Sequence, residues 1–415
     1  MRSLYSLATL LLLPVFFAHL LWRARRQPDY LRHWGERLGF SPRLTGPVLW
    51  LHAISVGETR AAAPLISALL HRYPDHRILL THTTPTGRAT GRELFAERVV
   101  QAYLPYDLPW AVRLFLHRSQ PRMGLLMETE IWPNLYVIAA QRDIPLFLVN
   151  ARMSEKSARG YAQFARLTRT ALQHLTAVAA QTEADAERLT ALGARTISVC
   201  GNIKFDVATP ADTPARVAEL RTLFGTRPVW LAASTREGEE ALILDAWQRH
   251  GSDALLVIVP RHPQRFDAVA ALLRARGIPF VQRSAGLTAD TDTEVVLGDS
   301  MGEMAAYYGA ADMAYIGGSL LPLGGQNLIE AAAMGCPILI GPHTFNFTAV
   351  AEAALAAGAA LRVADAKDLV RQVHALLNDA EQRAQMRVAG LAFAAQHQGA
   401  THRIVTLISA AHPPS

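Results

Sequence analysis

Short apolar runs that alternate with helical stretches constrain the fold of this chain more than any other feature. The alternation starts at Val48 and starts again after a linker at 209–214, which contains two threonines and two prolines. Such alternation is typical of a parallel sheet with helices on both faces. Because the pattern occurs twice in 415 residues, we predict two doubly wound α/β units in tandem, with a cleft between them.

The expected strands fall into two sets. In the first half they are 48–54, 77–83, 99–105, 122–128, 144–150 and 176–182, and the run 198–206 closes this half. In the second half they are 228–234, 254–260, 278–283, 293–299, 312–318 and 336–342. We expect helices between most of these strands and two more helices in the tail.

Charge and cysteine content narrow the classes of partner. The formal net charge is +6 and the pI is about 9.5, without a dense basic stripe interleaved with aromatic residues. We therefore expect no nucleic-acid partner, whereas an anionic membrane surface, phosphorylated substrates or plain solubility would suit this charge. The only cysteines, Cys200 and Cys336, lie far apart, and no pair of residues has metal-ligand spacing. This favours a reducing compartment and a protein without a bound metal.

The N-terminal segment Leu4–Trp22 is a nearly continuous apolar run. Its length is close to the roughly 20 residues that a helix needs to span a bilayer. Three arginines follow the run at once, whereas only Arg2 precedes it. The positive-inside rule then places the rest of the chain in the cytoplasm. A signal peptide is the alternative, but the charges lie on the wrong side of the run and no Ala-x-Ala site follows.

Acidic residues and one lysine are the candidate site residues of the first half. Glu58 follows the first strand and opens a helix, where a carboxylate can act as a general base or simply favour the helix N-terminus. Glu128 and Glu130 follow a later strand, where site chemistry and turn capping are both open. Lys204 ends this half, either facing an acidic substrate or paired with Asp206.

In the second half, Arg261 follows the strand ending at Pro260, where a guanidinium can grip a phosphate. The segment 298–304 is compatible with a phosphate seat at a helix start or with a capping box. It also matches the G-x-S-x-G nucleophile elbow at Ser300, with Asp312 and His343 following in hydrolase order, although no upstream oxyanion loop is found.

A glycine-rich segment follows the strand at 312–318. Glycines at 317, 318, 324 and 325 allow the backbone to approach a ligand closely. Glu330 then either binds ribose hydroxyls or caps the helix together with Asn327. The sequence contains neither a Walker A motif nor G-x-G-x-x-G, so a P-loop or dinucleotide site is not expected.

Taken together, these segments resemble the 3-deoxy-D-manno-octulosonic acid (Kdo) transferases of lipopolysaccharide assembly. The resemblance covers nearly the whole chain and rests on ordered motifs: HAISVGE, TTPTGR, PYDLPW, METEIWPN, NARMSEKS, GNIKFD, PRHPQRF, DSMGEM, GGSLLPLGGQNLIEAA and GPHTFNF. Two positions depart from the family pattern, which usually has His at Gln326 and Pro at Leu328.

The resemblance implies a GT-B fold and an enzyme that transfers Kdo from CMP-Kdo to a tetraacylated lipid A precursor (lipid IVA), with inversion at the anomeric carbon. It implies that Glu58 is the general base and that Lys204 assists the transition state together with Glu128 or Glu130. It further implies that CMP is held by Pro260, Arg261, Gly302, Glu303, Met304, Asn327, Leu328, Ile329 and Glu330.

On this interpretation residues 1–26 form a membrane anchor and 27–208 an acceptor-binding domain. Residues 209–415 form the nucleotide-sugar domain, whose last helix is free to pack back on the first domain. The enzyme would sit on the cytoplasmic face of the inner membrane and need neither cofactor nor metal, because a monophosphate leaving group does not require one. The rival interpretations are a UDP-sugar transferase or epimerase, a serine hydrolase, and a non-catalytic membrane-bound nucleotide sensor.

Overall fold

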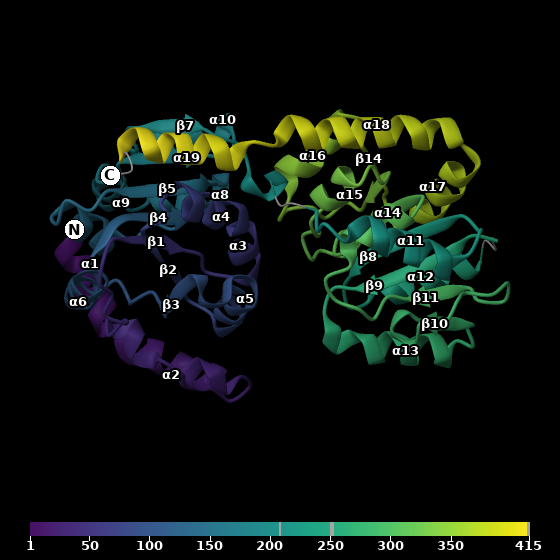
Figure 1. Ribbon diagram of the computed structural model, residues 1–415, viewed down its shortest axis with the longest axis horizontal. Coiled ribbons are helices and arrows are strands. Elements are labelled where there is room, and N and C mark those ends of the chain that lie inside the picture. Colours follow the sequence, from purple (N-terminus) through teal and green to yellow (C-terminus); the bar gives the residue numbers. More distant parts are fainter. Residues whose placement is uncertain (207–208, 250–252, 413–415) are drawn as a thin grey trace. The chain divides into compact units, whose positions relative to one another are not determined.

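A computed structural model describes residues 1–206, 209–249 and 253–412 of the protein (Figure 1). Its contacts divide the chain into two units. Unit 1 comprises Met1–Val207 and Gln398–Ser415, and unit 2 comprises Ala208–His397. Each unit contains one seven-stranded parallel sheet with helices on its faces, so the predicted pair of doubly wound units is confirmed.

The sheet of unit 1 has the strand order β3-β2-β1-β4-β5-β6-β7. Its strands are β1 Val48–His52, β2 Arg77–His82, β3 Val99–Tyr103, β4 Pro121–Met127, β5 Leu146–Ala151, β6 Ala177–Ala180 and β7 Ile197–Val199. Every residue of the central strands β1 and β5 is buried, as expected for parallel strands covered on both faces.

The helices of unit 1 pack on both faces of this sheet. They are α3 Val56–Ala61, α4 Ala63–Arg72, α5 Pro85–Phe95, α6 Pro109–Ser119, α7 Pro133–Ala140, α8 Glu155–Ala162, α9 Ala165–Leu172, α10 Glu183–Leu192 and α19 Ala400–Ala411, with 3-10 turns η1 Pro28–Leu31, η2 Trp34–Leu38, η3 Ala96–Arg98 and η4 Ile203–Asp206. The last helix, α19, contacts α4, and Ile404 and Ile408 are fully buried in the same core cluster as Leu65 and Leu69. The C-terminal segment therefore completes the core of unit 1.

The N-terminal segment differs from the single continuous helix expected for Leu4–Trp22. It forms α1 Arg2–Leu11 and α2 Leu13–Ala24, which bend by 45° at Leu12. The break is explained by Pro14, because proline lacks an amide hydrogen and its ring clashes with the carbonyl four residues earlier. Among the described residues no single helix has the length and apolarity to cross a membrane, and only this bent pair reaches them, by length and composition.

The sheet of unit 2 has the order β10-β11-β9-β8-β12-β13-β14. Its strands are β8 Val229–Thr235, β9 Leu255–Pro260, β10 Phe280–Gln282, β11 Val295–Leu297, β12 Met313–Ile316, β13 Ile338–Ile340 and β14 Ala360–Arg362. The sequence did not predict β14, which is three residues long and continues an alanine-rich stretch that lacks a strand signal.

The helices of unit 2 are α11 Thr213–Phe224, α12 Glu239–Gln248, α13 Phe266–Ala275, α14 Met304–Ala310, α15 Ile329–Ala333, α16 Thr348–Ala356, α17 Ala366–Asn378 and α18 Ala380–His397, with 3-10 turns η5 Pro263–Arg265 and η6 Arg283–Ala285. The prediction of two helices in the tail was wrong, because α16, α17, α18 and α19 all follow β13. Gly358, with φ of +72°, ends the apparently continuous alanine-rich helix before β14.

Both sheets reverse their strand order at a central pair of strands. This switch lies between β1 and β4 in unit 1 and between β8 and β12 in unit 2. In open α/β sheets, ligands bind outside the carboxyl ends of the strands at such a switch point. The segments that follow these four strands are therefore the first places to look for a site.

Candidate active site

Glu58 lies directly after β1, at the switch point of unit 1. Ser55 is the N-cap of α3, and its hydroxyl accepts the amide of Glu58. The Glu58 carboxylate in turn accepts the Ser55 hydroxyl at 3.1 Å and the Ile54 amide at 2.9 Å. The capping role considered from the sequence is thus realised, and the same bonds hold the carboxylate in one place at the end of β1.

The electrostatic surroundings of Glu58 suit a proton acceptor. Burial, and then the neighbouring Glu128 carboxylate, raise the pKa of Glu58 to about 7, with a smaller push from Glu130. The bonds from Ile54 and Ser55 act in the opposite direction, because they favour the ionised form. A carboxylate with a pKa near neutrality is the type of general base that removes a proton efficiently near neutral pH.

Glu128 follows β4, the other strand of the switch point, and pairs with Lys204. The Lys204 ammonium, from η4, lies 3.0 Å from Glu128 Oε1, and both side chains are partly exposed. The backbone of Glu128 has φ of +59°, a conformation that non-glycine residues rarely adopt and that often occurs at functional sites. The structure thus brings together Glu58, Glu128 and Lys204, three of the predicted site residues.

Glu130 has different partners from Glu128. Its carboxylate accepts the indole N–H of Trp132 at 2.8 Å, and its backbone carbonyl accepts the Tyr136 hydroxyl. The Nε2 atom of the fully buried His52 lies 3.8 Å from Glu130 Oε2. Through these contacts Glu130 links the loop after β4 to β1 and α7, whereas Glu128 is paired with the Lys204 ammonium.

Two buried side chains that the sequence did not single out support this part of unit 1. The Asp107 carboxylate accepts the amides of Asn134 and Leu135 and so caps α7, which follows the Glu128–Glu130 loop. Asn150, at the end of β5 with φ of +50°, accepts the Ile203 amide and fixes the start of η4. Asp107 lies in the motif PYDLPW and Asn150 is the first residue of NARMSEKS, so these motifs of the resemblance were the available signal.

In unit 2, Arg261 follows β9 and is held at its backbone and at its side chain. Its amide donates to the Thr235 carbonyl at 3.0 Å, and its Nε donates to Gln326 Oε1 at 3.1 Å. Pro260 is the buried last residue of β9. The side chain of Gln326 thus places an amide oxygen against the guanidinium of Arg261.

The predicted phosphate seat at 302–304 has an exposed glycine beside a buried acid. Gly302 has φ of +79°, and a Cβ added there would meet no atom within 4 Å. Glu303, the N-cap of α14, is buried and pairs with Arg216 at 3.4 Å and Arg283 at 3.2 Å. Met304 begins the helix. Glu303 is therefore neutralised by two arginines of its own unit.

Asn327 organises the glycine-rich loop at the start of α15. Its Oδ1 accepts the Ile329 amide at 3.1 Å, and its Nδ2 donates to Glu330 Oε1 at 3.2 Å. Leu328 is buried at the N-cap. Burial raises the pKa of the Tyr308 hydroxyl well above its usual value, with Glu330 raising it and Arg261 lowering it, so both charged groups lie near this tyrosine.

The segment after β8 is a part of unit 2 that sequence reasoning missed. Ser234 has φ of +54°, and Gly317 lies so close to it that an added Cβ would be 2.4 Å from the Ser234 carbonyl oxygen. The fully buried Glu239 accepts the Arg236, Gly318 and Leu320 amides and the Tyr315 hydroxyl. One carboxylate therefore joins the loops after β8 and β12 at the switch point.

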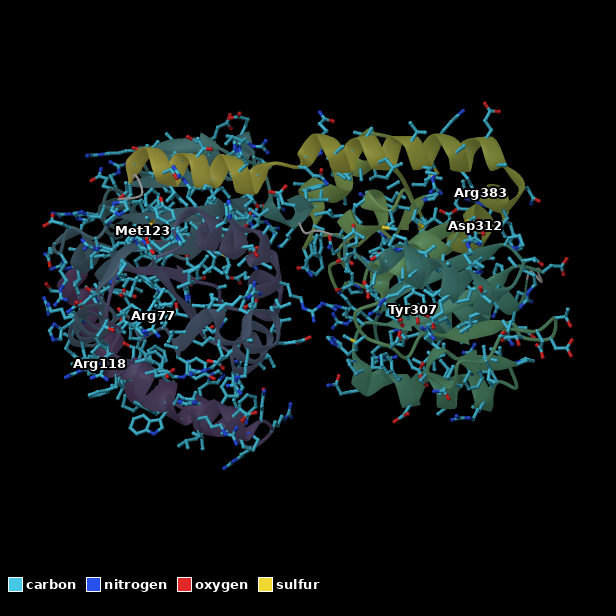
Figure 2. The ribbon with its side chains drawn as sticks, in the orientation of Figure 1. Arg77, Arg118, Met123, Tyr307, Asp312 and Arg383 are labelled. Carbon is cyan, nitrogen blue, oxygen red and sulfur yellow. The ribbon has the colours of Figure 1, made fainter. Side chains whose placement is uncertain are left out.

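The serine-hydrolase alternative does not fit the structure. Ser300, after β11, shares a hydrogen bond with the Tyr307 hydroxyl at 3.0 Å. Asp312 precedes β12 and accepts the amide of Val229, the first residue of β8, so it lies at the amino edge of the sheet (Figure 2). Ser300 and Asp312 therefore occupy opposite ends of the parallel strands and do not form a triad.

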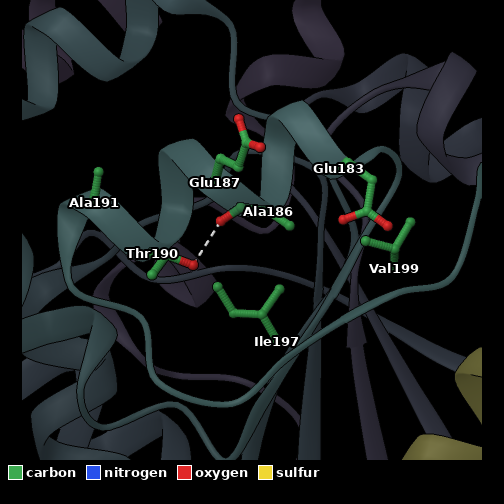
Figure 3. Close-up of a pocket in the computed structure, with 7 residues that line it drawn as sticks. All are labelled: Glu183, Ala186, Glu187, Thr190, Ala191, Ile197 and Val199. Atoms are coloured by element: carbon green, nitrogen blue, oxygen red, sulfur yellow. Dashed lines mark hydrogen bonds between the residues drawn. The ribbon is translucent and has the colours of Figure 1, made fainter.

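A groove elsewhere in unit 1 contains none of the predicted site residues (Figure 3). It lies beside the edge strand β7 and is lined by Glu183, Ala186, Glu187, Thr190, Ala191, Ile197 and Val199. Within the described ranges, no group of three or more His, Cys, Asp or Glu side chains is arranged to hold a metal ion.

Comparison with known proteins identifies relatives that match this chain over nearly the whole length of both proteins. The family model for 3-deoxy-D-manno-octulosonic-acid transferase (kdotransferase) matches residues 32–207. A 3-deoxy-D-manno-octulosonic acid transferase from Bordetella pertussis is 45% identical over 419 residues, which cover 97% of each chain. The Haemophilus influenzae transferase of the same name is 36% identical over 98% of each chain.

Solved structures resemble the fold. The UDP-GlcNAc 2-epimerase of Neisseria meningitidis matches with a TM-score of 0.59 and 15% identity, over 88% of this chain and 99% of that chain. The C-terminal CMP-Kdo binding domain of WaaA from Acinetobacter baumannii is 31% identical over 44% of this chain and 98% of that chain, with a TM-score of 0.43. The likeness to the epimerase confirms the predicted fold class.

Proposed function

Because the chain belongs to the 3-deoxy-D-manno-octulosonic acid (Kdo) transferase family of glycosyltransferases, we propose that it transfers Kdo from CMP-Kdo to lipid IVA with inversion at the anomeric carbon. Such a transfer is a direct displacement. A hydroxyl of the acceptor attacks the anomeric carbon from the face opposite CMP, and one base must take the proton of that hydroxyl.

The observation that carries this proposal is the state of Glu58. Its carboxylate is fixed by two hydrogen bonds at the switch point of unit 1, and its pKa is raised to about 7. An ordinary glutamate would be too weak a base to accept a proton from a sugar hydroxyl efficiently. Burial and the charge of Glu128 strengthen Glu58 as a base while leaving a large part of it ionised at neutral pH.

Glu128 and Lys204 form a pair beside the base, and we assign to them the stabilisation of the transition state. An ammonium and a carboxylate 3.0 Å apart can respond to charge that develops on the acceptor oxygen and at the anomeric carbon. The pairing with Lys204 favours Glu128 over Glu130 for this role, because Glu130 is engaged by Trp132.

For CMP we propose the groups of unit 2 at Pro260–Arg261, Gly302–Met304 and Asn327–Glu330. The leaving group is a monophosphate, whose growing charge Arg261 and the amides at Gly302 can stabilise. Glu330 would accept ribose hydroxyls, as acidic residues do in other nucleotide sites. We expect no metal ion, since a guanidinium can balance the charge of a monophosphate.

We further propose that the N-terminal helices hold the enzyme at the cytoplasmic face of the inner membrane, where the lipid acceptor resides. Large apolar side chains of α1 and α2 are exposed: Leu4, Leu7, Leu10, Leu11, Leu12, Val15, Leu21 and Trp22. Arginines follow at the end of α2, a charge pattern that favours contact with anionic lipid headgroups.

The test is incubation of the full chain with CMP-Kdo and lipid IVA in detergent, with mass analysis of the lipid product. A mass increase of one or more Kdo residues, with release of CMP, is the expected result. UDP-GlcNAc serves as the control donor and should give neither a transferred sugar nor an epimerised one. Loss of UDP from that control, with no product from CMP-Kdo, would contradict the proposal.

A further inference from the structure

Three cationic side chains and a histidine gather at the carboxyl ends of the neighbouring strands β8 and β9 in unit 2. They are Arg236 after β8, and Arg261, His262 and Arg265 after β9. Burial lowers the pKa of His262, and the charges of Arg236, Arg261 and Arg265 lower it further, so all three guanidinium groups lie near one imidazole. Such a gathering of like charges is unfavourable by itself and indicates an anionic ligand.

The three arginines are not equally available to a ligand. Arg265 is neutralised by the buried Glu240, whose carboxylate lies 2.8 Å from it. Arg261 donates to Gln326. Arg236 is half-buried, and among the described residues its guanidinium has neither a hydrogen bond nor an ion pair. It is therefore the cation of this group whose charge the protein leaves unbalanced.

The backbone of Arg236 is held in place by a hydrogen bond of its amide. Its amide donates to Glu239 at 2.9 Å, and Glu239 also holds the loop of Gly318. The side-chain stem of Arg236 lies against Gly318, where an added Cβ would be 3.4 Å from Arg236 Cγ and 3.1 Å from Gln326 Nε2. Gly318 and Gln326 thus lie between Arg236 and Arg261, so the two guanidinium groups belong to one site.

We propose that Arg236 binds the carboxylate of the donor sugar and thereby selects an acidic sugar. This inference rests on the proposed function and deepens it. In CMP-Kdo the phosphate oxygen and the carboxylate are attached to the same carbon, so the donor presents two anionic groups side by side. A neutral sugar would leave the half-buried charge of Arg236 without a partner, which disfavours its binding.

The phosphate and the carboxylate of the donor then have different ligands in the protein. Arg261 grips the phosphate, which CMP and CMP-Kdo share. Arg236 grips the carboxylate, which CMP lacks. Replacing Arg236 should therefore affect the donor but not the free nucleotide, and this difference is measurable.

The experiment compares wild type, Arg236→Gln and Arg236→Lys by KM for CMP-Kdo and Ki for CMP. For Arg236→Gln we expect KM to rise by about tenfold to a hundredfold while Ki for CMP stays within about twofold, since a charge-assisted bidentate contact is lost. Arg236→Lys should recover part of the loss, because it restores the charge without the two parallel donors. Arg276→Gln is the matched control: Arg276 caps the far end of α13 and pairs with Asp245 on the surface.

A second experiment pairs each enzyme variant with a donor analogue whose carboxylate is replaced by a carboxamide. Wild type should bind this analogue more weakly than CMP-Kdo, and Arg236→Gln should bind the two equally. An equal rise of KM and Ki would make Arg236 a phosphate ligand and overturn the assignment, as would a variant that behaves like wild type. Failure of wild type to bind CMP or to transfer Kdo would instead refute the proposed function, so the two failures are distinguishable.

Discussion

Both units have a seven-stranded parallel sheet that reverses its strand order at a central pair of strands, but the segments after their central strands carry opposite charge. In unit 1 the segments after β1 and β4 carry Glu58, Glu128 and Glu130, and Lys204 pairs with Glu128. In unit 2 the segments after β8 and β9 carry Arg236, Arg261 and Arg265. Topology thus determines where a ligand can bind in each unit, whereas the residues that follow the strands determine which ligand.

The difference in charge shifts titratable groups in opposite directions. Burial and then the neighbouring acids raise the pKa of Glu58, which makes it a better proton acceptor. Burial and then the neighbouring arginines lower the pKa of His262, which disfavours the charged form of its imidazole. One unit is therefore suited to base catalysis and the other to holding an anion, and each of the following experiments probes one side of this contrast.

The largest effect is expected for Glu58→Gln. The amide keeps the shape of the side chain but cannot take a proton, so the transfer rate should fall by roughly a hundredfold to ten-thousandfold. The affinity for CMP, measured by calorimetry, should not change, because the contrast assigns the nucleotide to unit 2. Glu155→Gln, at the exposed start of α8, is the control that removes a charge without removing the base. Full transfer activity in Glu58→Gln would exclude general-base catalysis by this residue.

Next in size is Glu239→Ala, which removes a fully buried acid beside the arginines of unit 2. The amides of Gly318 and Leu320 and the hydroxyl of Tyr315 would lose their acceptor, at a cost of about 2–4 kcal/mol in the free energy of unfolding. Chemical denaturation measures this loss, and CMP affinity should fall with it. A variant as stable as wild type would show that these donors find other partners.

The pH dependence of wild type tests the raised pKa directly. Glu58 acts when deprotonated, so kcat/KM should rise about tenfold per unit as the pH increases toward 7 and level off above it. An acid limb near pH 4.5 instead would mean that burial and Glu128 do not perturb this carboxyl group in the free enzyme. In Glu58→Gln the limb should disappear from the residual activity.

The smallest and most discriminating effect is a shift of that acid limb in Glu128→Gln. Since the Glu128 charge raises the pKa of Glu58, its removal should move the limb to lower pH by a few tenths of a unit to about one unit. Glu130→Gln should move it less, because Glu130 contributes less to the shift. The reverse order would make Glu130 the closer electrostatic partner of the base.

Much of this picture could be predicted from the sequence. The central strands are long apolar runs, and Glu58, Glu128 and Arg261 each follow one, which is where parallel sheets present their sites. The pairing of Lys204 with Glu128 rather than Glu130 joins residues 76 positions apart, so no local pattern reveals it. Arg236 was missed although it also follows a strand, because the surrounding Ser-Thr-Arg-Glu-Gly-Glu resembles ordinary turn and helix-start chemistry. Pro14 signalled the break after α1, but the apolarity of the whole run outweighed it.

The return of α19 to unit 1 has a consequence for how the protein is made. The α4 face around Leu65 and Leu69 is covered by Ile404 and Ile408, which follow the whole of unit 2 in the chain. During translation this apolar face of α4 therefore stays uncovered until all of unit 2 has been synthesised. Termination between His397 and Ala400 would leave all of unit 2 synthesised but the α4 face of unit 1 without its cover.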